Sequence, residues 1–169
     1  MRWTVLVLLA GLGGCTQPGS GQTQDSRHRS ALEAAAIARG VIADPDSTDL
    51  AGLYARDEDR VCIVPSRQDY VIGAVVAFED GQGCEARGIA RRAGDRVRVR
   101  FDTAEGCTFD LAFDGDTISF PAELPPACER LCRGRASFSA LSVGRLSDST
   151  SEARTLRGRK GQRLCAGAG

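Results

Sequence analysis

Six carboxylates occur within a short stretch of the sequence, and paired carboxylates are the groups that cleave glycosidic bonds by acid–base chemistry. They are Asp102, Glu105, Asp110, Asp114, Asp116 and Glu123. Such a pair requires one carboxyl with a raised pKa in an apolar cleft. Most of these acids fall in expected turns or on the polar side of an expected strand, so solvated surface is the favoured interpretation. A carboxylate-based hydrolase remains an alternative.

Ser142 lies in the segment Ala140-Leu141-Ser142-Val143-Gly144, one residue away from a nucleophile-elbow motif. Hydrolases that use this motif place their catalytic His after the Ser in the chain. The only His, His28, comes before Ser142. The sequence therefore predicts no catalytic triad, and we expect Ser142 on an ordinary strand.

Arg96, Arg98 and Arg100 alternate with apolar residues, which places all three on one face of an expected strand. A three-residue loop around Gly94 would set this face over small residues of the preceding strand. Those residues are Ala86, Gly88 and Ala90. Guanidinium groups bind phosphates and carboxylates through paired hydrogen bonds. The three arginines are therefore the candidate anion-binding residues, and a solvated strand face is the other interpretation. A second basic cluster near the C-terminus consists of Arg154, Arg157, Arg159, Lys160 and Arg163.

The N-terminus has one positive charge, an apolar run from Trp3 to Leu12, and then Gly13-Gly14-Cys15. This order resembles the lipobox of bacterial lipoproteins, and the resemblance covers residues 1–15. It implies a signal peptide over residues 1–14, cleavage after Gly14, and acyl chains on Cys15. Two or more acyl chains anchor a protein stably to a membrane. A membrane-spanning helix is excluded, because the apolar run is too short to cross a bilayer. An ordinary secretory peptide remains the alternative.

The residue after Cys15 is Thr16 and not Asp. By resemblance to Gram-negative lipoproteins, this implies an outer-membrane protein that faces the periplasm. Residues 16–29 are rich in Gly, Gln, Ser and Thr, so a flexible tether is expected over residues 15–29. Residues 30–169 are expected to form a single β-rich domain with an N-terminal helix and a basic C-terminal tail.

Beyond Cys15 the chain has six cysteines, an even number that indicates three disulfides in an exported protein. They are Cys62, Cys84, Cys107, Cys128, Cys132 and Cys165. The spacing of Cys128 and Cys132 also suits zinc, but no second cysteine pair or histidine accompanies them. We expect no metal and no cofactor. The flanking turns suggest Cys84–Cys107 as one bridge, and we expect Cys128 and Cys132 each to bond elsewhere.

Acidic and basic residues number 22 each, and loss of residues 1–14 removes only Arg2 from this balance. A nearly neutral chain argues against bulk nucleic-acid binding. The length suits one small domain with one core.

Alternation of apolar and polar residues predicts strands throughout the region that begins at Gly52. Regular strands are expected over residues 96–101, 107–113 and 118–120, and less regular ones over 52–56, 61–64, 70–78, 83–91 and 136–143. Capping boxes at Ser30–Glu33 and Ser149–Glu152 predict helices over residues 31–39 and from 150 to about 157. A short helical turn is expected from Pro125 through Leu131. Inward strand positions carry four core aromatics: Phe101, Phe109, Phe113 and Phe120.

We therefore expect a mainly β fold, a small antiparallel meander that forms a barrel or a sandwich, with short flanking helices and disulfides for stability. The expected role is binding or structural work in the cell envelope, without catalysis. Its expected partners are the membrane, through the lipid anchor, and an anionic envelope component or envelope protein. Lipoproteins of the lysozyme-inhibitor kind are similar in general plan, so inhibition of a cell-wall hydrolase is one alternative and an envelope hydrolase another.

Overall fold

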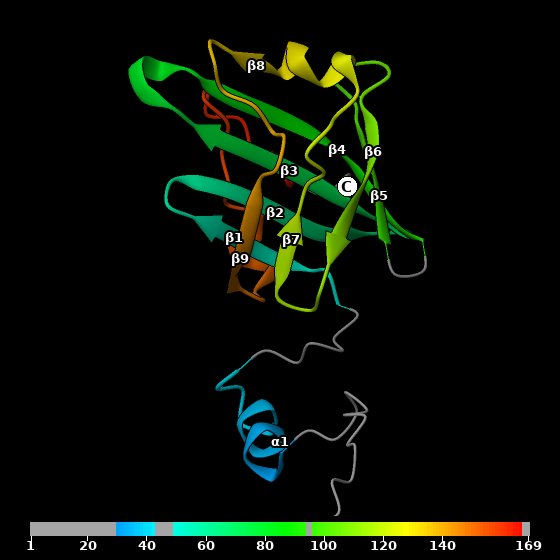
Figure 1. Ribbon diagram of the computed structural model, residues 1–169, viewed down its shortest axis with the longest axis vertical. Helices are drawn as coiled ribbons and strands as arrows, with labels where there is room; N and C mark the ends of the chain where they lie inside the picture. The colour runs from blue at the N-terminus through cyan, green and yellow to red at the C-terminus, as the bar shows by residue number, and fades with distance from the viewer. Residues whose placement is uncertain (1–29, 43–48, 94–95, 167–169) are drawn as a thin grey trace, which may run out of the picture.

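A computed structural model describes residues 30–42, 49–93 and 96–166 of the chain. Within these residues, eight antiparallel strands close into a barrel (Figure 1). The barrel strands are β1 (Gly52–Arg56), β2 (Asp59–Ser66), β3 (Asp69–Ala77), β4 (Gly83–Ala93), β5 (Arg96–Phe101), β6 (Thr108–Phe113), β7 (Thr117–Ser119) and β9 (Ser142–Ser147). Successive strands pair in chain order, and β9 closes the barrel by pairing with β7 on one side and β1 on the other. The expected antiparallel meander is confirmed, and it is a barrel.

Apolar side chains at alternate strand positions fill the barrel, as the period of two predicted. In β5, for example, Val97, Val99 and Phe101 are buried while the arginines between them are exposed. Four aromatic rings pack against one another in edge-on, tilted and stacked arrangements, with centroids 5.4–6.0 Å apart. They belong to Phe101, Phe109, Phe120 and Phe138. The interior around these rings is a packed core.

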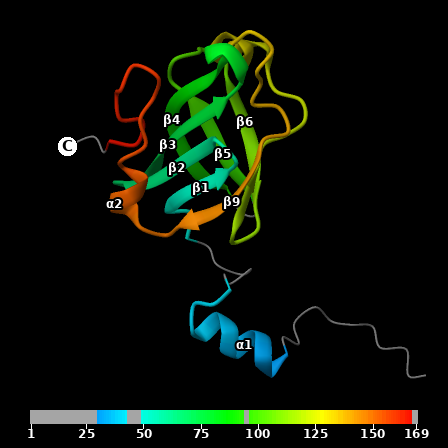
Figure 2. The same cartoon turned by 90° about the vertical axis from the view of Figure 1, so that its left-hand side faces the viewer.

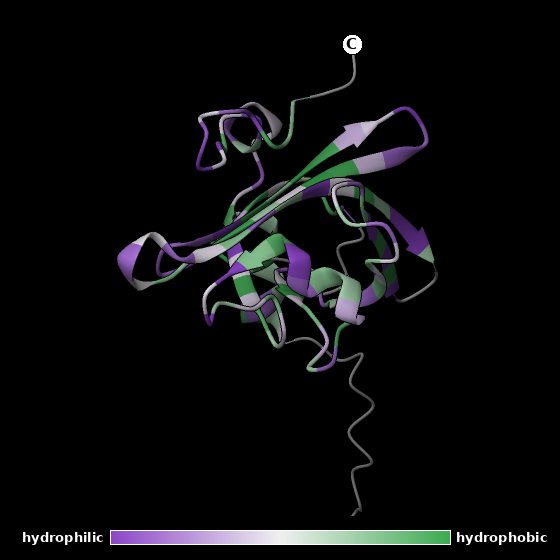
Figure 3. Ribbon diagram, turned by 90° about the horizontal axis from the view of Figure 1, so that it is seen from above, coloured by the Kyte–Doolittle hydropathy of each residue, from purple (hydrophilic) through white to green (hydrophobic). Residues whose placement is uncertain are grey.

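One end of the barrel is covered by the long connection between β7 and β9 (Figure 3). This connection contains the 3-10 helix η2 (Pro126–Leu131) and the two-residue strand β8 (Cys132–Arg133), which pairs with the start of β4. The helical turn expected here is confirmed. Cys107–Cys128 fastens η2 to the barrel, and Cys84–Cys132 fastens β8 to β4.

All six cysteines that follow Cys15 form disulfides, as expected, and Cys128 and Cys132 bond to separate partners. The suggested Cys84–Cys107 bridge is wrong. Cys84 faces Cys132 directly in the β4–β8 pairing, so the covering segment supplies the partner of each of these two cysteines. Sequence patterns do not show this segment folding back over the barrel.

The C-terminal segment packs against the outside of the barrel, beside β1 and β2 (Figure 2). It begins with α2 (Thr150–Ala153) and ends in the third disulfide, Cys62–Cys165. A second apolar cluster forms beneath it, made of Leu53, Cys62, Val64, Val71, Ala153, Leu164 and Cys165. Gly73 permits this contact, because a Cβ atom at that position would lie 2.5 Å from the Leu164 Cβ.

Two other expectations about the second half of the chain are wrong. The strand expected over residues 136–143 begins only at Ser142, because the preceding residues cover the end of the barrel. The helix expected to reach about residue 157 ends at Ala153, although Ser149 caps it as predicted by accepting a hydrogen bond from the Glu152 amide.

The N-terminal helix α1 (Ala31–Ala38) begins as its capping box predicts. The Ser30 hydroxyl accepts a hydrogen bond of 3.1 Å from the Glu33 amide. None of the helix residues is buried. Another short 3-10 helix, η1 (Glu79–Gly81), forms the turn between β3 and β4. The expected signal peptide and tether, Cys15 included, lie outside the described residues. Among those residues, no helix has both the length and the apolar character needed to cross a membrane.

Candidate anion-binding face

The candidate arginines all point outward from β5, as their alternation predicted. Arg96, Arg98 and Arg100 are exposed, whereas Val97 and Val99 between them are buried. The stripe therefore lies on the outer surface of the barrel, beside the neighbouring strands β4 and β6.

The predicted register of the β4–β5 hairpin is wrong by three residues. Arg96 pairs with Ala93, and Arg98 pairs with Arg91. An odd shift reverses the faces of a strand. The small residues expected beneath the arginines, Ala86 and Ala90, therefore face the core instead. The error came from assuming a three-residue loop, whereas only residues 94 and 95 separate the paired ends.

Acids on the flanking strands partly neutralise the stripe. Asp69 of β3 accepts two hydrogen bonds of 2.7 Å from Arg91 of β4. Asp110 of β6 accepts two from Arg98 of β5, one of them 3.0 Å long. Because Arg91 and Arg98 stand opposite each other, the four side chains form one row with an acid at each end and two arginines at the centre. We call this row the charge ladder.

Each arginine of the ladder lowers the pKa of the carboxyl that it holds, chiefly by direct hydrogen bonds to the ionised form. Both carboxyls are therefore held ionised, whereas a glycosidase general acid needs a raised pKa. The positive charge of Arg100, the next exposed arginine of β5, is less well neutralised, because its carboxylate partner Asp102 lies 3.8 Å away.

The other residues that the sequence suggested for chemistry form hydrogen bonds within turns and strands of the barrel. Asp114 accepts a 2.7 Å hydrogen bond from the Thr117 amide and so caps the turn between β6 and β7. Ser142 lies on β9, where its Oγ is 3.3 Å from the Ser119 Oγ. Among residues 30–42, 49–93 and 96–166, no group of three or more His, Cys, Asp or Glu side chains could hold a metal ion.

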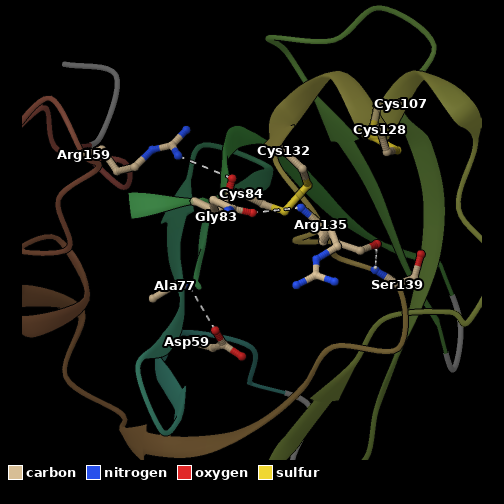
Figure 4. Close-up of a disulfide and its surroundings, with 12 residues drawn as sticks. Asp59, Ala77, Gly83, Cys84, Cys107, Cys128, Cys132, Arg135, Ser139 and Arg159 are labelled. Atoms are coloured by element: carbon tan, nitrogen blue, oxygen red, sulfur yellow. Dashed lines mark hydrogen bonds between the residues drawn. A yellow bond between two sulfur atoms is a disulfide. The ribbon is translucent and has the colours of Figure 1, made fainter. Parts of the chain in front are cut away.

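The second basic cluster lies on a small hairpin of the C-terminal segment, where Arg157 and Arg163 face each other. Glu85 of β4 holds the hairpin tip by accepting a 2.6 Å hydrogen bond from the Arg159 amide and another from Gln162. Figure 4 shows Arg159 reaching the carbonyl of Gly83, beside the Cys84–Cys132 disulfide. The cluster is thus fixed to the start of β4, whereas Arg91 and Arg98 pair near the end of that strand.

The sequence interpretation missed Arg145, which continues the inward alternation of Leu141 and Val143 into the barrel end away from η2. Only 14% of its side chain is exposed. Its guanidinium lies 4.9 Å from the Tyr54 ring centroid and 5.7 Å from that of Phe113. Three backbone carbonyls accept its hydrogen bonds, those of Asp49, Ala51 and Gly115.

Arg145 closes this barrel end as a partly buried cation, and the neighbouring Tyr54 is fully buried. Burial raises the pKa of the neighbouring Tyr54 hydroxyl, although the positive charge of Arg145 acts in the opposite direction. The Tyr54 hydroxyl donates a 2.9 Å hydrogen bond to the Leu50 carbonyl. The extended alternation from Leu141 was the signal that could have identified Arg145.

Comparison of the chain with protein-family models, with curated proteins and with solved structures gave no match.

Proposed function

We propose that this protein is a lipid-anchored binding protein of the bacterial cell envelope, and that it contacts carboxylates of an envelope polymer through the outer face of β4 and β5. The observation that carries the proposal is the direction of the arginines. The interior of the barrel is a packed core, so a ligand meets the outside, where the β5 arginines are exposed.

The charge ladder supports carboxylate as the ligand chemistry. Arg91 and Arg98 already hold Asp69 and Asp110 in paired hydrogen bonds, which is the geometry in which a guanidinium recognises a carboxylate. The cations on this face are Arg87, Arg91, Arg96, Arg98 and Arg100, and the acids are Glu85, Asp69, Asp102 and Asp110. Among the described residues of this face, cations exceed acids by one, so an added carboxylate relieves repulsion between neighbouring arginines.

The way the acids are used supports the proposal of a binding role without catalysis. A carboxylate hydrolase needs two facing carboxyls, one of them with a raised pKa. Here Asp110 is held ionised by Arg98, and Asp114 caps a turn. These engagements favour binding over the alternative of an envelope hydrolase.

The anchor can be tested at Cys15. We expect mass spectrometry of the mature protein to show an N-terminal Cys15 that carries at least a diacylglycerol. Cys15→Ala should leave an uncleaved or soluble species, because the acylated sulfur is then missing. Recovery of a chain that starts at Thr16 without lipid would refute the anchor but would leave the binding face untouched.

The binding face can be tested with purified peptidoglycan sacculi, which carry peptide carboxylates. Full-length protein in detergent should co-sediment with them, and binding should weaken steeply with salt because exposed charges are screened beyond about 8 Å at physiological ionic strength. The triple variant R96Q/R98Q/R100Q should lose this binding. Its free energy of unfolding should fall by no more than about 1 kcal/mol, since exposed ion pairs contribute little.

A matched control removes the same charge elsewhere. Arg133, Arg135 and Arg163 are exposed and belong to neither β4 nor β5, so R133Q/R135Q/R163Q should bind sacculi nearly as well as the wild type. Equal loss in both triple variants would reduce the effect to net charge and contradict the proposal. Release of soluble fragments from the sacculi would instead indicate a hydrolase, and protection of sacculi from added lysozyme would indicate an inhibitor.

A further inference from the structure

A groove of about 580 Å³ lies beside the charge ladder, at the turn between β2 and β3. Its volume falls within the range of small-ligand sites. Its lining residues are Ser66, Arg67, Gln68, Asp69, Tyr70, Val71, Arg87, Gly88, Ile89 and Asp102. It therefore combines apolar, hydroxyl, amide and charged groups from three parts of the barrel.

The register of the sheet explains how these groups are arranged. Val71 of β3 and Ile89 of β4 pair directly and form an apolar row. The ladder residue Asp69 lies two residues before Val71 on β3, so it is the next residue on the same face of the sheet. Arg87 and Asp102 lie one row to the other side, where the Asp102 amide donates a 2.9 Å hydrogen bond to the Arg87 carbonyl. Val71 is itself buried in the second apolar cluster, so Ile89 is the more accessible of the two. The groove thus has a small apolar centre between two charged rims.

The two acids of the groove are already engaged by arginines that do not line it. Asp69 is bound by Arg91, and Asp102 lies 3.8 Å from Arg100. The arginines that line the groove are in a different position. Arg87 donates to the backbone carbonyl of Ala166, a neutral acceptor that does not offset its positive charge. Arg67 is exposed at the turn. The groove therefore presents positive charge that its own carboxylates do not balance.

Arg67 also has a left-handed backbone, with φ of 49°. Glycine and asparagine adopt this conformation more easily than arginine does. The left-handed residues at two other turns of the barrel, Asp57 and Asp80, have short polar side chains suited to it. An arginine here costs stability, and such strain is often retained at functional sites.

We propose that this groove binds a short peptide that ends in a free carboxylate and has small apolar side chains. Arg67 takes the carboxylate at one rim, and Arg87 donates to the peptide backbone at the opposite rim. Ile89 contacts the side chains, and Ser66 and Gln68 hydrogen-bond the peptide amides. The proposal rests on the function proposed above and deepens it, because it names the part of the polymer that is recognised.

Calorimetry with two matched probes tests the groove in the full-length protein. The probes are acetyl-Ala-Ala-Ala with a free carboxylate and the same peptide with a C-terminal amide. The free carboxylate should bind about tenfold or more tightly than the amide, since the amide lacks the charge-assisted hydrogen bonds. Equal affinity for the two probes, or no binding of either at millimolar concentration, would overturn the proposal.

Two substitutions and one control locate the site. Arg67→Asn should reduce affinity for the carboxylate probe by about tenfold while it preserves or raises the thermal midpoint, because Asn tolerates the left-handed backbone. Arg87→Gln should reduce affinity similarly. Arg135→Gln, which alters an exposed arginine outside both the groove and the β4–β5 face, should leave probe affinity unchanged. Unchanged affinity in both Arg67→Asn and Arg87→Gln would place the ligand elsewhere.

The outcomes separate this inference from the proposed function. Salt-sensitive binding of sacculi without binding of the tripeptide would reject the groove and retain the arginine face. Tripeptide binding without any sacculus binding would retain the groove as a peptide site and reject the polymer-binding function.

Discussion

Removal of the Cys62–Cys165 disulfide is expected to lower the free energy of unfolding by about 4.7 kcal/mol, from the entropy that this bridge removes from the unfolded chain. Its two cysteines are 103 residues apart in the sequence, the largest separation of the three bridges. For separations of 48 and 21 residues, the same relation gives about 4.1 kcal/mol for Cys84–Cys132 and about 3.3 kcal/mol for Cys107–Cys128.

Urea unfolding of three double variants, each with one cysteine pair replaced by Ala, measures these losses. Replacing both cysteines avoids a free thiol that could exchange with the remaining bridges. The Cys62→Ala/Cys165→Ala variant should have the lowest midpoint, also because both sulfurs lie in the second apolar cluster. The chain-entropy explanation fails if loss of the Cys107–Cys128 bridge proves the most damaging of the three.

Replacement of Arg145 by Ala is expected to lower the free energy of unfolding by about 3 kcal/mol, because three backbone carbonyls, two of them in part-buried hydrogen bonds, lose their donor. Three backbone carbonyls accept from this guanidinium, and the rings of Tyr54 and Phe113 lie against it. The substitution also removes two cation–π contacts and opens space at the barrel end.

Thermal and urea unfolding of Arg145→Ala, Arg145→Lys and Arg98→Ala separate burial from charge. Lys keeps the charge but lacks the planar fork that reaches several carbonyls, so its loss should be intermediate. Arg98→Ala removes an exposed ion pair and should cost no more than about 1 kcal/mol. If Arg145→Ala were as mild as Arg98→Ala, Arg145 would not close the barrel.

The strands that the sequence predicts well are those with one buried and one exposed face. In β5, each arginine lies between two buried apolar residues, so the period of two is unambiguous. The strand β9 was misplaced because inward positions after Val143 include Arg145, which breaks the apolar pattern that the prediction relied on. Barrel closure by β9 depends on a pairing between distant parts of the chain, which no local pattern encodes.

The candidate site was predictable in its composition but not in its environment. Alternation alone placed Arg98 on the outer face, yet its partner Asp110 follows from the β5–β6 register. The error of three residues in the neighbouring hairpin hid the pairing of Arg91 with Arg98. The groove around Arg67 was also invisible, since it combines a turn with strands that are distant in the sequence.

The three disulfides of the barrel are nested, with Cys107–Cys128 inside Cys84–Cys132 and both inside Cys62–Cys165. During export with the N-terminus first, Cys62, Cys84 and Cys107 all enter the oxidising compartment before any of their partners. Each later cysteine then pairs with the most recent one that is still unbonded. Native bridges can thus close in order of arrival, whereas oxidation of Cys62 with Cys84 would trap the chain until the pair was reshuffled. Oxidation without reshuffling therefore requires that Cys62 stay reduced until Cys165 has emerged.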